Sequence, residues 1–250
     1  MLLKMQCLCT KKKKYLTARN AIIAICILLG LLLRLMECIR FPVQPRDAYE
    51  YESIIREWED NGEMPRQYKG PLSLWLLKSP HHFFGLDTIK GGVIVNNAIG
   101  ILLMLIVMQE AFNFFKSDCI VLLVGMIMAT HPQLIRFSCF FLRENSYLLF
   151  SVFFLGALAR YCNCNRLGYI VKAAIMGALA FLCRQEGLEF LAIACIAIML
   201  AGLFNGKKFF PSACHCVFFV LVFSLALAIV CHMMHFKIYG ISEMMNSFDV

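Results

Sequence analysis

Charged residues are scarce in this sequence. They make up 16% of its 250 residues, whereas hydrophobic residues make up 60% and the mean hydropathy is +0.72. An ordinary soluble domain is about 25% charged and about half apolar. The composition therefore excludes a single soluble domain and predicts a membrane protein with many spans. Because each span uses roughly 20 residues, the chain has no room for a sizeable soluble domain beside them.

Zinc-site spacing and a disulfide framework are also missing. The 13 cysteines are odd in number and lie mostly in apolar runs, where a thiol packs as a small hydrophobe. The pairs Cys7/Cys9, Cys162/Cys164 and Cys214/Cys216 are Cys-x-Cys, which is not the spacing of a zinc site. We therefore expect structural or incidental roles for the cysteines and no metal site fixed by a motif.

Acidic residues are absent from the basic N-terminal stretch, which holds Lys4, Lys11, Lys12, Lys13, Lys14 and Arg19. Such a cluster before an apolar run is a cytoplasmic topology signal, and it can contact anionic membrane lipid. Residues 1–19 are therefore predicted to form a basic cytoplasmic tail. Because the net charge of +8 is concentrated there without interleaved aromatic residues, no nucleic-acid partner is expected.

Apolar runs bounded by charge or by Gly, Pro and Asn predict an all-α, polytopic transmembrane helix bundle of about seven spans. The runs cover residues 20–39, 91–113, 118–137, 141–161, 168–184, 187–205 and 212–235. Residues 20–250 would form one domain of a multi-pass protein in a bacterial cell (inner) membrane. Every second short loop is mainly basic, and such loops lie on the cytoplasmic side. This pattern places the N-terminus inside and residues 40–90 outside.

The predicted outer loop, residues 40–90, is expected to contain two short helices on the membrane surface. Its first helix is predicted over Ala48–Asp60, because apolar side chains recur there at spacings of three and four. These side chains are Tyr51, Ile54, Ile55 and Trp58. A second apolar stretch runs from Leu72 to Leu77. Asp47 directly precedes the first helix, where a carboxylate can cap the free amides of the first turn or serve as a functional group.

The order of motifs in this loop resembles the glycosyltransferase C superfamily. The closest likeness is to the branch of protein O-mannosyltransferases and the lipid A aminoarabinose transferase. It rests on Asp47 after the first span, a Tyr-containing amphipathic helix, the Gly62-x-x-Pro65 turn, Lys69 with Pro71-Leu72, and Trp75. The stretches Leu142-Arg143-Glu144 and Leu182-Cys183-Arg184-Gln185-Glu186-Gly187 are also similar to that family.

The resemblance implies an inverting membrane glycosyltransferase that uses a polyprenyl-phosphate-linked sugar donor. The acceptor would be a glycan, lipid or protein on the outer face, and the process would be glycosylation in the cell envelope. Asp47 would be the general base, which takes the acceptor's proton. The donor phosphate would be bound by Lys69, Arg143 and Arg184. Its negative charge must be neutralised, either by such cations or by a divalent metal. Supporting roles would fall to Tyr51, Glu144, Glu186 and His131.

Other interpretations of the same residues stay open. An arginine beside a glutamate at a membrane boundary is often a snorkelling cation with a surface partner, which applies to Arg143 and Arg184. His131 could line a pocket or simply end a helix before Pro132. Arg34 and Glu37, one turn apart, could pair locally. The alternative functions are a noncatalytic or truncated membrane subunit of this family, and a small permease or flippase.

Overall fold

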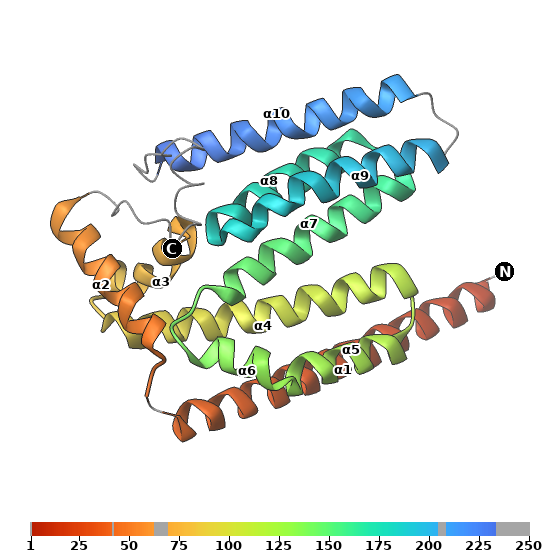
Figure 1. The fold of residues 1–250 in the computed structure, drawn as a ribbon. Coiled ribbons are helices and arrows are strands. Elements are labelled where there is room, and N and C mark those ends of the chain that lie inside the picture. The colour runs from red at the N-terminus through yellow and green to blue at the C-terminus, as the bar shows by residue number, and fades with distance from the viewer. Residues whose placement is uncertain (1, 42, 63–69, 205–208, 234–250) are drawn as a thin grey trace. The chain divides into compact units, whose positions relative to one another are not determined.

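The computed structural model describes residues 2–41, 43–62, 70–204 and 209–233, with side chains from residue 19 onward apart from 209–210. The described residues form ten α-helices, one 3-10 helix and no strand (Figure 1). The chain divides into two compact units, and each is described by itself. Unit 1 holds residues 1–49 and 76–152, and unit 2 holds residues 50–75 and 153–250.

The helices follow one another with short connections. They are α1 (Leu2–Arg40), α2 (Arg46–Asn61), α3 (Pro71–Phe84), α4 (Thr88–Phe115), α5 (Asp118–Thr130), α6 (Pro132–Cys139), α7 (Glu144–Cys164), α8 (Leu167–Cys183), the 3-10 helix η1 (Gln185–Leu188), α9 (Glu189–Phe204) and α10 (Phe209–Met233). The all-helical prediction is confirmed for the described residues.

Five of the described segments are long and apolar enough to cross a membrane. They are Arg19–Arg40, Thr88–Phe115, Glu144–Cys164, Gln185–Phe204 and Pro211–Met233. The pair α5 and α6 would make a sixth if it counts as one span. The predicted count of about seven is not reached, because α8 has only 17 residues. At 1.5 Å per residue it is about 26 Å long, shorter than the roughly 30 Å hydrocarbon core.

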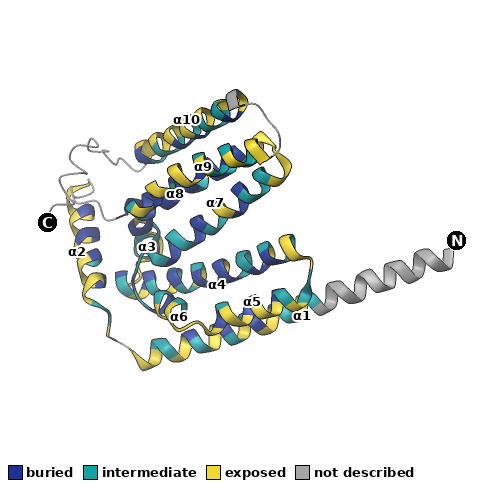
Figure 2. Cartoon of the chain, turned by 45° about the vertical axis from the view of Figure 1, so that its right-hand side comes forward, coloured by how far each residue is buried: buried dark blue, intermediate teal, exposed yellow. Residues whose placement is uncertain are grey.

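Large apolar side chains face outward along the candidate spans. Leu28 in α1 is 67% exposed, and Leu221 in α10 is 63% exposed. Figure 2 shows exposed residues along most of α10. A soluble protein rarely leaves contiguous apolar surface of this extent in water. The helices therefore suit a multi-pass membrane protein, in which lipid covers these side chains.

The core of unit 1 lies where α1, α4 and α5 meet. Its fully buried members are Cys26, Met104, Met108, Val121 and Ala129. Residue Gly100 of α4 faces α6 so closely that an added Cβ would overlap Ser138 Oγ. Small residues at such contacts let membrane helices approach each other, since the hydrophobic effect does not drive their association inside lipid.

The core of unit 2 is built mainly from phenylalanines of α7, α9 and α10. The rings of Phe154 and Phe190 stack with centroids 4.4 Å apart. Phe219 and Phe223 of α10 continue this aromatic cluster. Helix α10 packs along α8 and α9 within this unit.

A proline breaks the predicted span over residues 118–137. Helix α5 ends at Thr130 and α6 begins at Pro132, with a bend of 55° between them. The residue before a proline is pushed out of the helical region, and His131 accordingly has an extended backbone (φ −64°, ψ 117°). The single span predicted there is therefore a bent pair of helices.

The two helices predicted between residues 40 and 90 are present as α2 and α3. The face of α2 carrying Tyr51, Ile54, Ile55 and Trp58 is buried, as its spacing predicted, while the opposite face is exposed (Figure 2). Helix α3 continues through Pro80 instead of ending near it. Proline has no N–H for the Leu76 carbonyl, and the Ser79 hydroxyl donates to that carbonyl instead, at 2.7 Å.

Candidate functional site

Asp47 lies in the first turn of α2 as an exposed carboxylate. The helix begins one residue before it, at Arg46, and the Ala48 N–H donates to the Pro45 carbonyl at 3.0 Å. The Asp47 side chain forms no hydrogen bond or ion pair with any described residue. It therefore does not act as the helix cap that its position in the sequence also allowed.

Asp87 shows what a capping carboxylate looks like in the same unit. It directly precedes α4, and its Oδ1 accepts the Lys90 N–H at 3.0 Å. Glu52, one of the acids that follow Asp47 on α2, is likewise engaged, because its Oε1 lies 2.6 Å from the Arg56 guanidinium. Asp47 differs from both because it has no such partner in the described part of the chain.

The turn between α6 and α7, which ends at Arg143 directly before Glu144, is held by Asn96 of α4. The fully buried Asn96 amide nitrogen donates to the carbonyls of Phe137, Phe140 and Leu142 at 3.0, 2.7 and 2.7 Å. An amide has two N–H groups, so the three acceptors share two hydrogens. Asn96 thereby satisfies carbonyls that no regular helix would satisfy.

A second polar side chain, that of Gln44 in the segment before α2, binds the same turn. The Phe141 N–H donates to Gln44 Oε1 at 2.8 Å, and Gln44 Nε2 lies 3.5 Å from the Cys139 carbonyl. Gln44 and Asp47 are three residues apart in the chain. In unit 1 the Gln44 side chain therefore connects the segment before α2 to the backbone of the turn before α7.

Arg34 is a buried cation inside the first candidate span. Its side chain is 2% exposed, and it donates to Ser138 Oγ and to the Gly30 carbonyl, each at 3.0 Å. It does not pair with Glu37, which lies 3.4 Å from Arg136 instead, so the local pairing considered from the sequence is wrong. A buried arginine with no acidic partner among the described residues is costly, and such residues in spans commonly mark functional regions.

The remaining site residues of unit 1 have simple positions. Arg143 and Glu144 are half-buried at the start of α7, where the Tyr147 N–H donates to the Arg143 carbonyl at 3.3 Å. His131 is exposed at the break between α5 and α6. Its backbone ends one helix and starts the next, which agrees with the structural role considered for it.

Two stretches that carried the family resemblance meet in unit 2. Gly70, directly before α3, has a φ of +73°, and a Cβ added to it would overlap the Cys183 carbonyl oxygen. Only glycine fits both the left-handed backbone and this close approach. The Lys69–Leu72 motif therefore includes a residue packed against the chain directly before Arg184. Lys69 itself lies outside the described residues.

Arg184 and Glu186 form a two-pronged ion pair with each other. Arg184 Nη2 lies 2.6 Å from Glu186 Oε1, and Nε lies 3.2 Å from Oε2. The two side chains are 26% and 47% exposed, so the pair lies at a surface. This is the arrangement expected of a boundary arginine with a surface partner, and it also presents the guanidinium edge that a phosphate would use. Tyr51, in contrast, is buried in the apolar face of α2.

The sequence did not single out Ser138, Asn145 or Gln44 as site residues. Asn145 donates to Ser138 Oγ and to the Asn96 carbonyl, at 3.0 and 3.1 Å, and so completes the polar cluster around Arg34. The available signal was the presence of an arginine and small polar residues inside apolar runs. No group of three or more metal-ligating side chains occurs among the described residues.

No protein-family model, curated protein or solved structure matches this chain.

Proposed function

We propose that this protein is an integral-membrane glycosyltransferase that uses a polyprenyl-phosphate-linked sugar. The observation that carries the proposal is the exposed Asp47 carboxylate, which follows the first candidate span and is engaged by no described residue. A general base must be free to accept a proton within reach of the acceptor. A carboxylate used for capping, like Asp87, or held in an ion pair, like Glu52, is less available for this task.

In the proposed reaction the acceptor hydroxyl oxygen attacks the anomeric carbon of the donor while Asp47 takes the hydroxyl proton. The bond between the anomeric carbon and the phosphate oxygen breaks, and polyprenyl phosphate leaves with both bonding electrons. The attack inverts the anomeric configuration. Lys69, Arg143 and Arg184 are the proposed cations for the leaving phosphate, whose charge must be neutralised as it departs.

Arg184 can take a phosphate without a change in its own geometry. Its guanidinium already presents two donors to the Glu186 carboxylate, and a phosphate accepts the same pair of parallel hydrogen bonds. A donor phosphate would thus replace Glu186 as the partner. The packing of Gly70 against Cys183 supports a common role for the Lys69 and Arg184 motifs.

We further propose an inner-membrane protein with a cytoplasmic N-terminus and with α2 and α3 on the outer face. The count becomes seven spans if both α8 and the α5–α6 pair cross the bilayer. An adjustment of a few ångströms in the local bilayer would accommodate the short α8, since thinning around short helices costs little.

The test is sugar transfer by the purified full chain in nanodiscs with polyprenyl-phosphate hexose and pentose donors. Asp47→Asn is expected to lower the rate by about a hundredfold to ten-thousandfold, the usual contribution of a general base. Unfolding stability should stay unchanged, since the Asp47 carboxylate makes no hydrogen bond or ion pair within the described residues. Asp87→Asn, a matched change on a cap that asparagine also satisfies, should keep full activity.

Two results would contradict the proposal. Wild-type transfer by Asp47→Asn would exclude Asp47 as the base. Failure of the folded wild-type protein to use any polyprenyl-phosphate sugar would leave the noncatalytic subunit or the permease as the better interpretation.

A further inference from the structure

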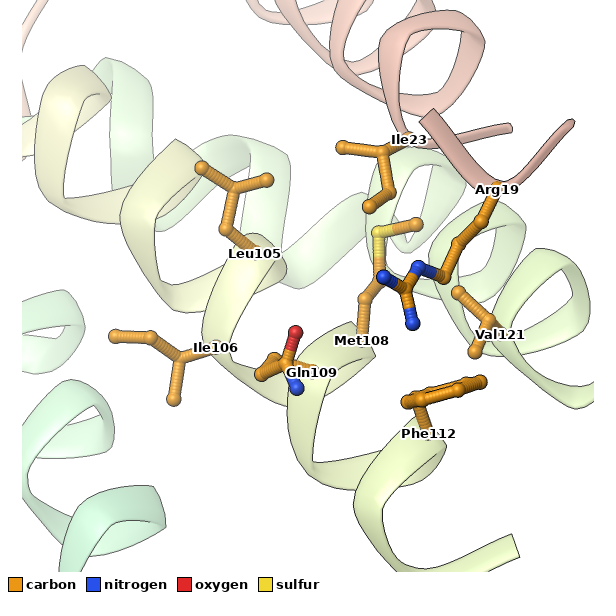
Figure 3. Close-up of a pocket in the computed structure, with 8 residues that line it drawn as sticks. All are labelled: Arg19, Ile23, Leu105, Ile106, Met108, Gln109, Phe112 and Val121. Carbon is orange, nitrogen blue, oxygen red and sulfur yellow. The ribbon is translucent and has the colours of Figure 1, made fainter. Parts of the chain in front are cut away.

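A pocket in unit 1 lies at the N-terminal end of the first candidate span, whereas Asp47 follows the C-terminal end of that span. It has a volume of about 270 Å³ and lies between α1, α4 and α5 (Figure 3). Its wall is mainly apolar and includes Ile23, Leu105, Met108 and Val121. The volume is just below the roughly 300 Å³ at which pockets begin to hold whole small ligands. It therefore suits part of a longer molecule.

Phe112, in the wall of this pocket, has two cations near its ring, and one of them, Arg19, also lines the pocket. The Arg19 guanidinium carbon is 4.4 Å from the centre of the Phe112 ring, and the Lys116 ammonium is 5.5 Å from the same centre. Figure 3 shows the Arg19 side chain extending into the pocket near Phe112. An anion in the pocket beside Arg19 would be attracted by that guanidinium and also by the Lys116 charge near the same ring.

The protein supplies no such anion within its described residues. Neither Arg19 nor Lys116 forms a salt bridge with a described acid, and Asp118, two residues after Lys116, pairs with neither. The residues before the first span contain no Asp or Glu at all. Within the described residues, Arg19 and Lys116 are therefore left available to an anion from another molecule.

The depth of the pocket indicates what that molecule is. Arg19 begins one candidate span and Lys116 directly follows another, so both cations lie at a predicted membrane boundary. Leu105 lies ten residues inside the second span, which at 1.5 Å per residue is about 15 Å deeper than Phe115. A ligand that fills this site has an anionic group at the boundary and an apolar chain extending into the hydrocarbon region.

We infer that this pocket binds an anionic phospholipid, with its headgroup phosphate bound by Arg19, near Lys116, and an acyl chain against Ile23 and Leu105. The charge complements the phosphate, and the wall complements the chain. This site is separate from the proposed Asp47 base and does not depend on the proposed transferase activity.

The test is the lipid retained by the purified full chain, measured by native mass spectrometry after exposure to equal amounts of phosphatidylglycerol and phosphatidylcholine. The wild-type protein should retain phosphatidylglycerol preferentially. The preference should fall about fivefold for each cation removed in Arg19→Gln and Lys116→Gln, the usual contribution of one basic residue at an anionic membrane surface. Arg166→Gln, which removes an exposed cation elsewhere on the predicted inner side, is the matched control and should leave the preference unchanged.

A further variant tests the chain, and a competitor tests the headgroup. Leu105→Trp fills the apolar wall and should lower retention of both lipids. Equal retention of the two lipids by the wild-type protein, or an equal loss in Arg166→Gln, would overturn the proposal. Release of phosphatidylglycerol by inorganic phosphate would also overturn it, because the site would then hold a soluble anion. The charge variants change no core side chain, so they decide the question if Leu105→Trp does not fold.

Discussion

The packing of Gly70 against the Cys183 carbonyl makes a sharp prediction about the candidate site in unit 2. A methyl group at residue 70 would overlap that carbonyl, and the Gly70 carbonyl also accepts the Leu74 N–H at 3.1 Å, in the first turn of α3. Gly70→Ala must therefore displace either the start of α3 or the chain before Arg184. Both belong to the motifs that we propose bind the donor phosphate.

The stability cost of the close contact at residue 70 can be separated from the cost of its left-handed backbone conformation. Gly62 has nearly the same φ, +70° against +73°, but nothing lies within 4 Å of a Cβ placed there. A left-handed conformation costs a non-glycine residue about 1–2 kcal/mol, partly offset by roughly 0.4–1 kcal/mol from the unfolded chain. Gly62→Ala should therefore destabilise by about 1 kcal/mol. Gly70→Ala should cost about 1–3 kcal/mol more, the usual range for overpacking.

The two variants are compared by reversible unfolding in mixed micelles, and by sugar transfer if the wild type proves active. We expect Gly70→Ala to be the less stable variant and to lose transfer beyond what the stability loss explains. Gly62→Ala should keep wild-type transfer. Equal stability of the two variants would show that residue 70 does not pack against Cys183, and would refute the contact between the two motifs.

Two further predictions concern unit 1 and the topology. Asn96→Ala should destabilise by about 1–3 kcal/mol in the same unfolding assay, since a hydrogen bond between membrane helices contributes roughly 0.6 kcal/mol on average and up to about 1.7. Asn97→Ala should cost less, because the Asn97 amide donates to one carbonyl of another helix, that of Ser138, besides a carbonyl of its own helix and a distant Cys38 thiol. The reverse order would refute the role of Asn96. In a cysteine-free background, Glu57→Cys should react with an impermeant maleimide from outside the cell and Asn165→Cys only after permeabilisation; labelling of residue 57 solely from the cytoplasm would invert the topology.

Periodic features were predictable because they depend on nearby residues. The spacing of Tyr51, Ile54, Ile55 and Trp58 fixes one face of α2, and that face is the buried one. The apolar runs predicted the candidate spans within a few residues. The count was less certain because α8, at 17 residues, is shorter than the hydrocarbon core, and because a bent pair such as α5 and α6 can cross as one span or not.

The polar cluster around Arg34 was not predictable, because its members are distant in the chain. Arg34 and Ser138 are 104 residues apart, and Asn96 and Leu142 are 46 apart. No local pattern specifies such pairs. The sequence suggested the nearest opposite charge, Glu37, as the partner of Arg34. In the structure the Arg34 guanidinium instead points toward Ser138 of α6 and the Gly30 carbonyl. A charged neighbour one turn away, such as Glu37, competes with every acceptor on a helix packed beside it.

A shift of one or two residues in where a helix begins decides whether an aspartate caps the helix, as Asp47 and Asp87 show. Each aspartate precedes a run of helical residues, so each could cap its helix by sequence alone. Asp87 lies just outside α4 and caps it, whereas α2 starts at Arg46 and takes Asp47 into its first turn. The cause is local, because the Pro45 carbonyl already accepts the Ala48 N–H and starts the turn. Helix boundaries are the least certain part of any sequence prediction, usually by one or two residues. That shift leaves the Asp47 carboxylate free of capping, and a free carboxylate after the first span is what the proposed base requires.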